Sequence, residues 1–136
     1  MKTVFLDTNV VIDLLDKREN FYIDALKIFT KAYNKEIKVF ISPITYATAS
    51  YVLRKHEKSE LKTLLYNLRQ LVSISICDET VIDSSLESDF EDFEDAMQFF
   101  CALLSNAEVI VTRNKKDFYK STIKVMTPSE FLSQST

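Results

Sequence analysis

Aspartates occur at three points of the chain where they could act together on a phosphate ester. Asp7 ends the apolar run VFLD, Asp95 opens the segment DAMQFFCALL, and Asp117 follows the run VIVTRNKK. Carboxylates that share a crevice repel one another and raise each other's pKa, and a bound cation relieves this repulsion. Carboxylate oxygens favour Mg²⁺ or Mn²⁺ over Zn²⁺. The three aspartates therefore predict a divalent-metal site that cuts nucleic acid with a metal-activated water.

Each of these acids also has a purely structural interpretation. Asp7 is a favoured N-cap residue for a following helix, and acids just before or inside a first helical turn interact well with the helix dipole. Asp117 also fits a surface turn in which neighbouring cations pair with it. The single histidine, His56, lies in the charged segment RKHEK and is expected to be solvated. We therefore expect neither a zinc site nor a histidine-based catalytic triad.

Short apolar runs alternate with helical patterns along the whole chain. Strands are predicted over residues 3–6, 39–41, 72–77, 108–111 and 123–126. Helices are predicted over 8–16, 21–33, 43–55, 59–71, 78–86, 95–106 and 128–132, with a helical turn in the loop 112–118. This alternation predicts one domain over residues 1–136, a three-layer α/β/α fold with a parallel, about five-stranded sheet. Ligands of such sheets bind outside the carboxyl ends of the strands, where Asp7 falls.

The composition excludes several other classes of protein. The chain has 136 residues, a net charge of -3 and no glycine, so it lacks the loops that cradle phosphates in P-loop and dinucleotide-binding proteins. Its two cysteines form no CxxC pair and are expected to be reduced core residues. We find no signal peptide or membrane-spanning run and expect a cytoplasmic protein. Without glycine, Asn34 and Asn106 are the expected helix-ending residues.

The ordered set of motifs resembles the PIN-domain family of metal-dependent ribonucleases. VFLDTNVVID is similar to the opening strand and first acid of that family, and FISPITYATASYVL to its second strand and following helix. DFEDAMQFFCALLSNAEVIVTRNKKDF is similar to the segment that carries the third acid and the late TRN-type loop. The ending VMTPSEFL is also typical of the family. No single piece is specific, but the order of the pieces is.

The resemblance implies roles for individual residues. Asp7 and Asp95 would be metal ligands, and the remaining ligand would be either Asn114 or Asp117. Thr8 and Thr112 would bond a ligating carboxylate or a water, and Asn9 would steady the loop. The implied contacts to nucleic acid are Arg113, Lys115 and Lys116, while the other lysines and arginines are expected to be solvated.

One position departs from the family pattern. The helix after the second strand usually carries a glutamate, and here that position is Thr48. A hydroxyl removes one negative charge from the site, and Asp92 or Glu94 would replace only part of it. The departure lowers the expected metal affinity.

Three functions compete at this stage. The first is an endoribonuclease, which the resemblance implies to be a homodimeric toxin with an antitoxin partner. The second is a PIN-like module that binds RNA or protein without cutting, as the Thr48 substitution favours. The third is a phosphoaspartyl enzyme with Asp7 as nucleophile, which Asn9 disfavours because such enzymes usually carry an aspartate there.

Overall fold

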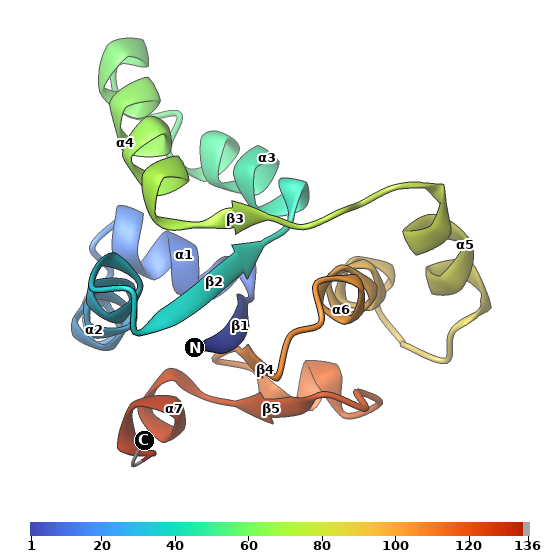
Figure 1. The fold of residues 1–136 in the computed structure, drawn as a ribbon. Helices are drawn as coiled ribbons and strands as arrows, with labels where there is room; N and C mark the ends of the chain where they lie inside the picture. The colour runs from blue at the N-terminus through green and yellow to red at the C-terminus, as the bar shows by residue number, and fades with distance from the viewer. Residues whose placement is uncertain (135–136) are drawn as a thin grey trace.

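A parallel five-stranded sheet lies at the centre of the computed structural model, which describes residues 1–134 (Figure 1). The strand order is β3-β2-β1-β4-β5. The strands are β1 (Lys2–Leu6), β2 (Ile37–Ile41), β3 (Ser73–Ile74), β4 (Val109–Val111) and β5 (Lys124–Met126). Strand β1 is central, pairing with β2 on one side and β4 on the other. Its last three residues are fully buried, as expected for a strand covered on both faces.

Helices cover both faces of this sheet. They are α1 (Thr8–Leu15), α2 (Tyr22–Tyr33), α3 (Pro43–Val52), α4 (Lys58–Leu71), α5 (Glu79–Glu87), α6 (Phe93–Leu104) and α7 (Pro128–Ser133), with a 3₁₀ turn, η1 (Lys115–Phe118). One apolar cluster joins alternate strand residues to α1, α2, α4 and α7. The opposite cluster joins the intervening strand residues to α5, α6 and η1. The predicted three-layer α/β/α fold with a parallel sheet is therefore confirmed.

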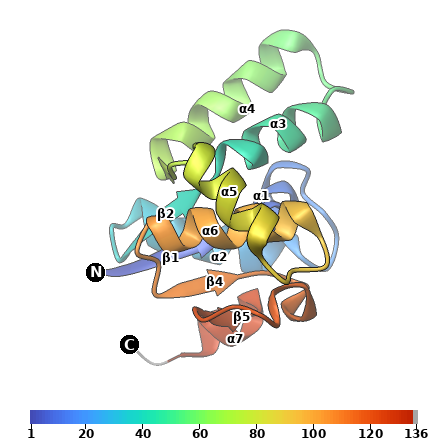
Figure 2. The same cartoon turned by 90° about the vertical axis from the view of Figure 1, so that its right-hand side faces the viewer.

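Helices α3 and α4 form a hairpin that extends beyond the sheet (Figures 1 and 2). Tyr46 in α3 donates its hydroxyl to the Leu65 carbonyl of α4 at 3.1 Å, which ties the two helices together. The predicted helix 43–55 is too long, because α3 ends at Val52 and a turn follows. His56 lies in this turn, half-buried against Glu60, so the prediction that it is solvated is wrong. Among residues 1–134, no helix is long and apolar enough to cross a membrane.

Two local predictions also need correction. The strand predicted over 72–77 is only Ser73–Ile74, because β3 is an edge strand and the chain leaves the sheet after one further bond, from Ser75 N to the Ile41 carbonyl. The turn after α2 reverses at Lys35, with φ of 60°, rather than at Asn34. Asn106 does adopt the left-handed conformation after α6, with φ of 56°, in the place glycine usually takes.

Candidate active site

Asp7 lies at the carboxyl end of β1 and is only 8% exposed. Its Oδ1 accepts hydrogen bonds from Thr8 N at 2.9 Å and Gln98 Nε2 at 3.3 Å. Its Oδ2 accepts from Thr112 Oγ1 at 2.8 Å and Asn9 Nδ2 at 3.3 Å. Burial raises the pKa of Asp7, while the bonds from Thr112, Thr8 and Gln98 oppose that rise. Asp7 therefore caps α1 and is also held in one orientation at the sheet edge.

Gln98 is a buried polar residue that the sequence analysis did not identify. It is 1% exposed, accepts from the Ser42 hydroxyl, and donates Nε2 to Asp7 Oδ1 and to Thr8 Oγ1 at 3.0 Å. Ser42 is the N-cap residue of α3, but its hydroxyl makes no capping bond and donates to Gln98 instead. A signal was present in the sequence, since Gln98 follows Asp95 by three residues and so shares its helix face. Gln98 connects three elements around Asp7.

Asp95 lies in the first turn of α6 and is half-buried. The N-cap residue Asp92 accepts a hydrogen bond from Asp95 N at 3.0 Å. Burial raises the pKa of Asp95 to about 7, and repulsion from Asp92, Asp117, Asp7 and Glu94 adds to the rise. The residues predicted from separate parts of the chain therefore act on one another through their charges.

The loop after β4 places its two candidate ligands on different sides. Asp117 lies with Asp92 and Asp95 in a cavity of about 290 Å³, whose rim also carries Glu91, Lys116 and Tyr119. Asn114 is exposed and lines a separate cavity beside Phe21. Charge on Asp117 also contributes to the raised pKa of Asp7. The geometry therefore favours Asp117 over Asn114 as the partner of Asp7 and Asp95.

The carboxylate oxygens of the site are ligands of the kind that a hard divalent cation prefers. The groups that act on one another are carboxylates, and oxygen donors with excess negative charge suit Mg²⁺ or Mn²⁺. Within residues 1–134, no three carboxylate, imidazole or thiol groups stand close enough together to hold one ion in their present positions. One or two of these carboxylates, with waters and a substrate phosphate, would complete the coordination of such an ion.

Arg113 has a different environment from the one expected. Its Nε and Nη2 donate to the two carboxylate oxygens of Asp13 at 2.7 Å and 3.1 Å. The guanidinium carbon also lies 4.0 Å from the centre of the Phe21 ring. Lys115 is paired with Glu130 at 3.1 Å, whereas Lys116 borders the acidic cavity. Of the three predicted contacts to nucleic acid, only Lys116 lacks an ion-pair partner among the described residues.

Thr48 is half-buried in α3, one turn after Thr45. Thr45 belongs to the Asp7 network, because its Oγ1 lies 2.8 Å from Thr8 Oγ1. Residues three apart share a helix face. The position that carries glutamate in the expected pattern is therefore on the site side of α3, but it supplies a hydroxyl.

The comparison with known families gives the decisive match. The model of the PIN domain matches residues 3–116. The chain belongs to the PIN-domain family. This PIN domain is 26% identical over 136 residues to ribonuclease VapC1 from Aquifex aeolicus (strain VF5), over 94% of this chain and 92% of that relative.

Solved structures give the same fold for this PIN domain. A toxin–antitoxin complex from Klebsiella pneumoniae matches with a TM-score of 0.69 and 23% identity, over 92% of this chain and 97% of that one. VapBC2 from Rickettsia felis, solved bound to a DNA fragment from its promoter, matches with a TM-score of 0.67 and 21% identity, over 91% and 96%. These similarities establish a shared fold.

Proposed function

We propose that this PIN domain is a divalent-metal-dependent endoribonuclease. The observation that supports the proposal is an acidic cavity beside the carboxyl end of the central strand: Asp95 and Asp117 line it, and Asp7 ends the neighbouring strand. Charge on Asp117 and Asp7 adds to the raised pKa of Asp95. Repelling carboxylates at this edge are costly for a fold unless a cation offsets them. The relative named as a ribonuclease supports RNA as the substrate.

The chain's own residues would divide the work as follows. Asp7, Asp95 and Asp117 would hold a Mg²⁺ or Mn²⁺ ion, which when bound supplies an activated water and offsets charge on the phosphate. Thr112, Thr8 and Gln98 keep both oxygens of Asp7 in place through the hydrogen bonds described above. Asn9 steadies the loop after β4, since its Oδ1 accepts from Arg113 N at 3.4 Å. Asp92 and Glu94 add negative charge beside Asp95.

The proposal extends to partners and location. The similarity to the toxin–antitoxin complex from Klebsiella pneumoniae supports a toxin role with an antitoxin protein as partner. Exposed apolar residues, Phe21 in the turn before α2 and Tyr51 in α3, support a homodimer or antitoxin interface. We place this toxin in the cytoplasm, where its RNA substrate would be.

The test is cleavage of single-stranded RNA with and without Mn²⁺. We expect metal-dependent cleavage by the wild-type protein and its loss in both Asp7→Asn and Asp95→Asn. The exposed Asp89→Asn is the matched control and should cut normally. Full activity in either site variant would contradict the proposal.

A second function is favoured by Thr48, which leaves the site one carboxylate short of the family pattern. In that case the domain binds RNA or protein without cutting it. Calorimetry with Mn²⁺ separates the two functions. Failure to bind millimolar Mn²⁺, with RNA binding intact, would favour the binding module.

A further inference from the structure

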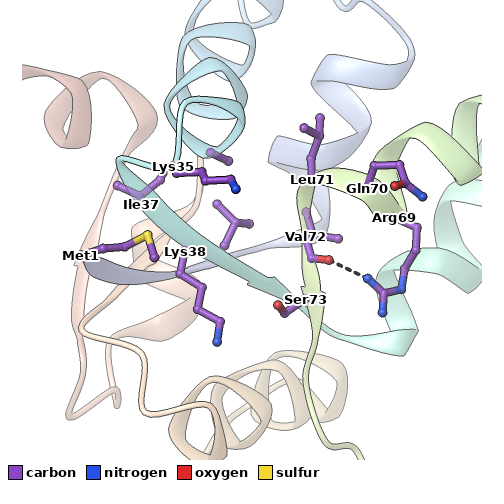
Figure 3. A pocket seen from close by; sticks show the side chains of 11 residues that line it. Met1, Lys35, Ile37, Lys38, Arg69, Gln70, Leu71, Val72 and Ser73 are labelled. Atoms are coloured by element: carbon purple, nitrogen blue, oxygen red, sulfur yellow. Dashed lines mark hydrogen bonds between the residues drawn. The ribbon is translucent and has the colours of Figure 1, made fainter.

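A second cavity lies at the opposite, amino-terminal edge of the sheet (Figure 3). It measures about 690 Å³ and is formed by the ends of β2, α4 and β3. Its charged lining residues are Lys35, Lys38 and Arg69, and no carboxylate is among the described residues that line it. The chain as a whole is acidic, with 20 acidic and 17 basic residues, whereas this cavity is lined by three cations and no acid among the described residues. The cavity is therefore locally positive.

Ion pairs among the described residues do not use these cations, although the Lys38 ammonium lies 5.2 Å from the centre of the Phe40 ring. None of the three forms an ion pair within residues 1–134, whereas nearby Lys31 is paired with Glu36 at 3.6 Å. Arg69 is held in place because its Nη1 donates to the Val72 carbonyl at 2.9 Å (Figure 3). A guanidinium has five N–H donors, so most of them are available to an anion.

Two of the three cations also extend in the same direction. In Figure 3 the side chains of Lys38 and Arg69 extend to the same side of the sheet, with Ser73 between them in this view. Ser73 pairs in register with Phe40, which places its side chain on the same face as Lys38, two residues earlier in β2. An ammonium, a guanidinium and a hydroxyl on one face are the donors that phosphate oxygens accept from.

We propose that this cavity binds the phosphate backbone of a single-stranded RNA, as a second contact separate from the acidic edge. The proposal rests on the proposed ribonuclease function. A protein of net charge -3 with acids at its cutting edge needs cations elsewhere to hold a polyanion. Near that edge Arg113 and Lys115 are already paired with Asp13 and Glu130, and of the three predicted contacts only Lys116 is without an ion pair among the described residues.

The cavity would contact the phosphate backbone of the RNA and not its bases. Among the described residues that line the cavity there is no aromatic side chain on which a base could stack. Strand β2 spans five residues, so the cavity lies roughly 15 Å from the acidic edge. The RNA must therefore be long enough to reach from one edge to the other, and short substrates gain nothing from the cavity.

The test compares two double variants of equal charge. Lys35→Gln/Lys38→Gln removes two cavity cations, and Lys27→Gln/Lys58→Gln removes two exposed cations elsewhere. Binding of a labelled single-stranded RNA is measured against salt in EDTA, where no cutting occurs. We expect the cavity variant to bind about tenfold more weakly, with a salt slope smaller by about 1.4, equally for uridine-rich and adenosine-rich RNA. The control should bind like the wild type.

Cleavage in Mn²⁺ separates this proposal from the proposed function. We expect the cavity variant to show a raised KM on long RNA and an unchanged kcat, with no change on a dinucleotide. Equal binding by the two double variants would overturn the cavity assignment, even if both cut RNA normally. Weaker RNA binding without cleavage by any variant would support the cavity and contradict the nuclease. A larger loss for duplex DNA than for RNA would also overturn it.

Discussion

Gln98 Nε2 donates to Asp7 Oδ1 at 3.3 Å, across 91 residues of sequence. The same carboxamide accepts from Ser42, and both side chains are buried. Gln98→Leu should lower the free energy of unfolding by about 1–3 kcal/mol, because the buried Ser42 hydroxyl loses its partner and Asp7 loses one of its hydrogen bonds. It should also lower RNA cleavage on the order of tenfold, since Asp7 is freed to rotate.

Denaturant unfolding and initial cleavage rates measure both effects of Gln98→Leu. The exposed Asn67→Leu in α4 is the matched control and should change neither. A stable Gln98→Leu protein with normal cleavage would show that this hydrogen bond does not position Asp7.

Asp95 predicts a pH dependence of stability in the metal-free protein. Its pKa is about 7 in the folded state, above the ordinary value of 3.8. The folded state therefore binds the proton more tightly, so stability is lost as pH rises from about 4 to about 7. Asp95→Asn removes this loss, and its melting temperature relative to wild type should rise over that window. Asp89→Asn is the control, and its melting temperature relative to wild type should be the same at about pH 4.5 and about pH 7.5. The same result for Asp95→Asn would contradict the raised pKa.

Thr48→Glu should strengthen the metal site. Thr48 is on the same helix face as Thr45, which contacts the Asp7 network through Thr8. A carboxylate there adds an oxygen donor with charge, so Mn²⁺ affinity should rise on the order of tenfold and cleavage with it. Thr48→Gln keeps the length without the charge and is the control. Calorimetry that gives both variants the same affinity would place this position outside the site.

Substitutions of Asp117 and Asn114 should differ in their effect on metal binding, which identifies the remaining ligand. Asp117 shares the acidic cavity with Asp95, while Asn114 lines another cavity. Asp117→Asn should weaken Mn²⁺ binding tenfold or more, and Asn114→Ala should leave it unchanged. Metal titration of the two variants decides between them, and the reverse order would assign the role to Asn114.

The Arg113–Asp13 pair predicts a large effect on stability. Asp13 is 1% exposed, so Arg113→Met strands a buried charge and should cost about 3–5 kcal/mol. The double variant Asp13→Leu/Arg113→Met removes both charges and should recover most of that loss. Chemical denaturation of the single and double variants measures the coupling. Equal destabilisation by both would show that packing against Phe21, not charge, is what Arg113 contributes.

Local patterns predicted most elements and the position of Asp7 at the end of a strand. Alternation of apolar runs and helical spacing depends on neighbouring residues, so the strand that ends at Asp7 and the helix that carries Asp95 follow from the sequence. The predicted ends of two elements, the edge strand β3 and the helix α3, were less accurate. Tertiary pairing sets the end of β3, and a turn sets the end of α3. The parallel sheet then brings the strand tips to one edge.

The sequence by itself determined that Asp7 ends an apolar strand and that Asp95 lies at the start of a helix, because apolar runs and helix periodicity are local properties. Tertiary structure alone decided that Gln98 holds Asp7, that Asp117 faces the acids, and that Arg113 is paired with Asp13. It also decided that Lys35, Lys38 and Arg69 share a cavity. These relationships join side chains from distant segments, and their distances depend on how the layers pack rather than on the spacing of residues along the chain.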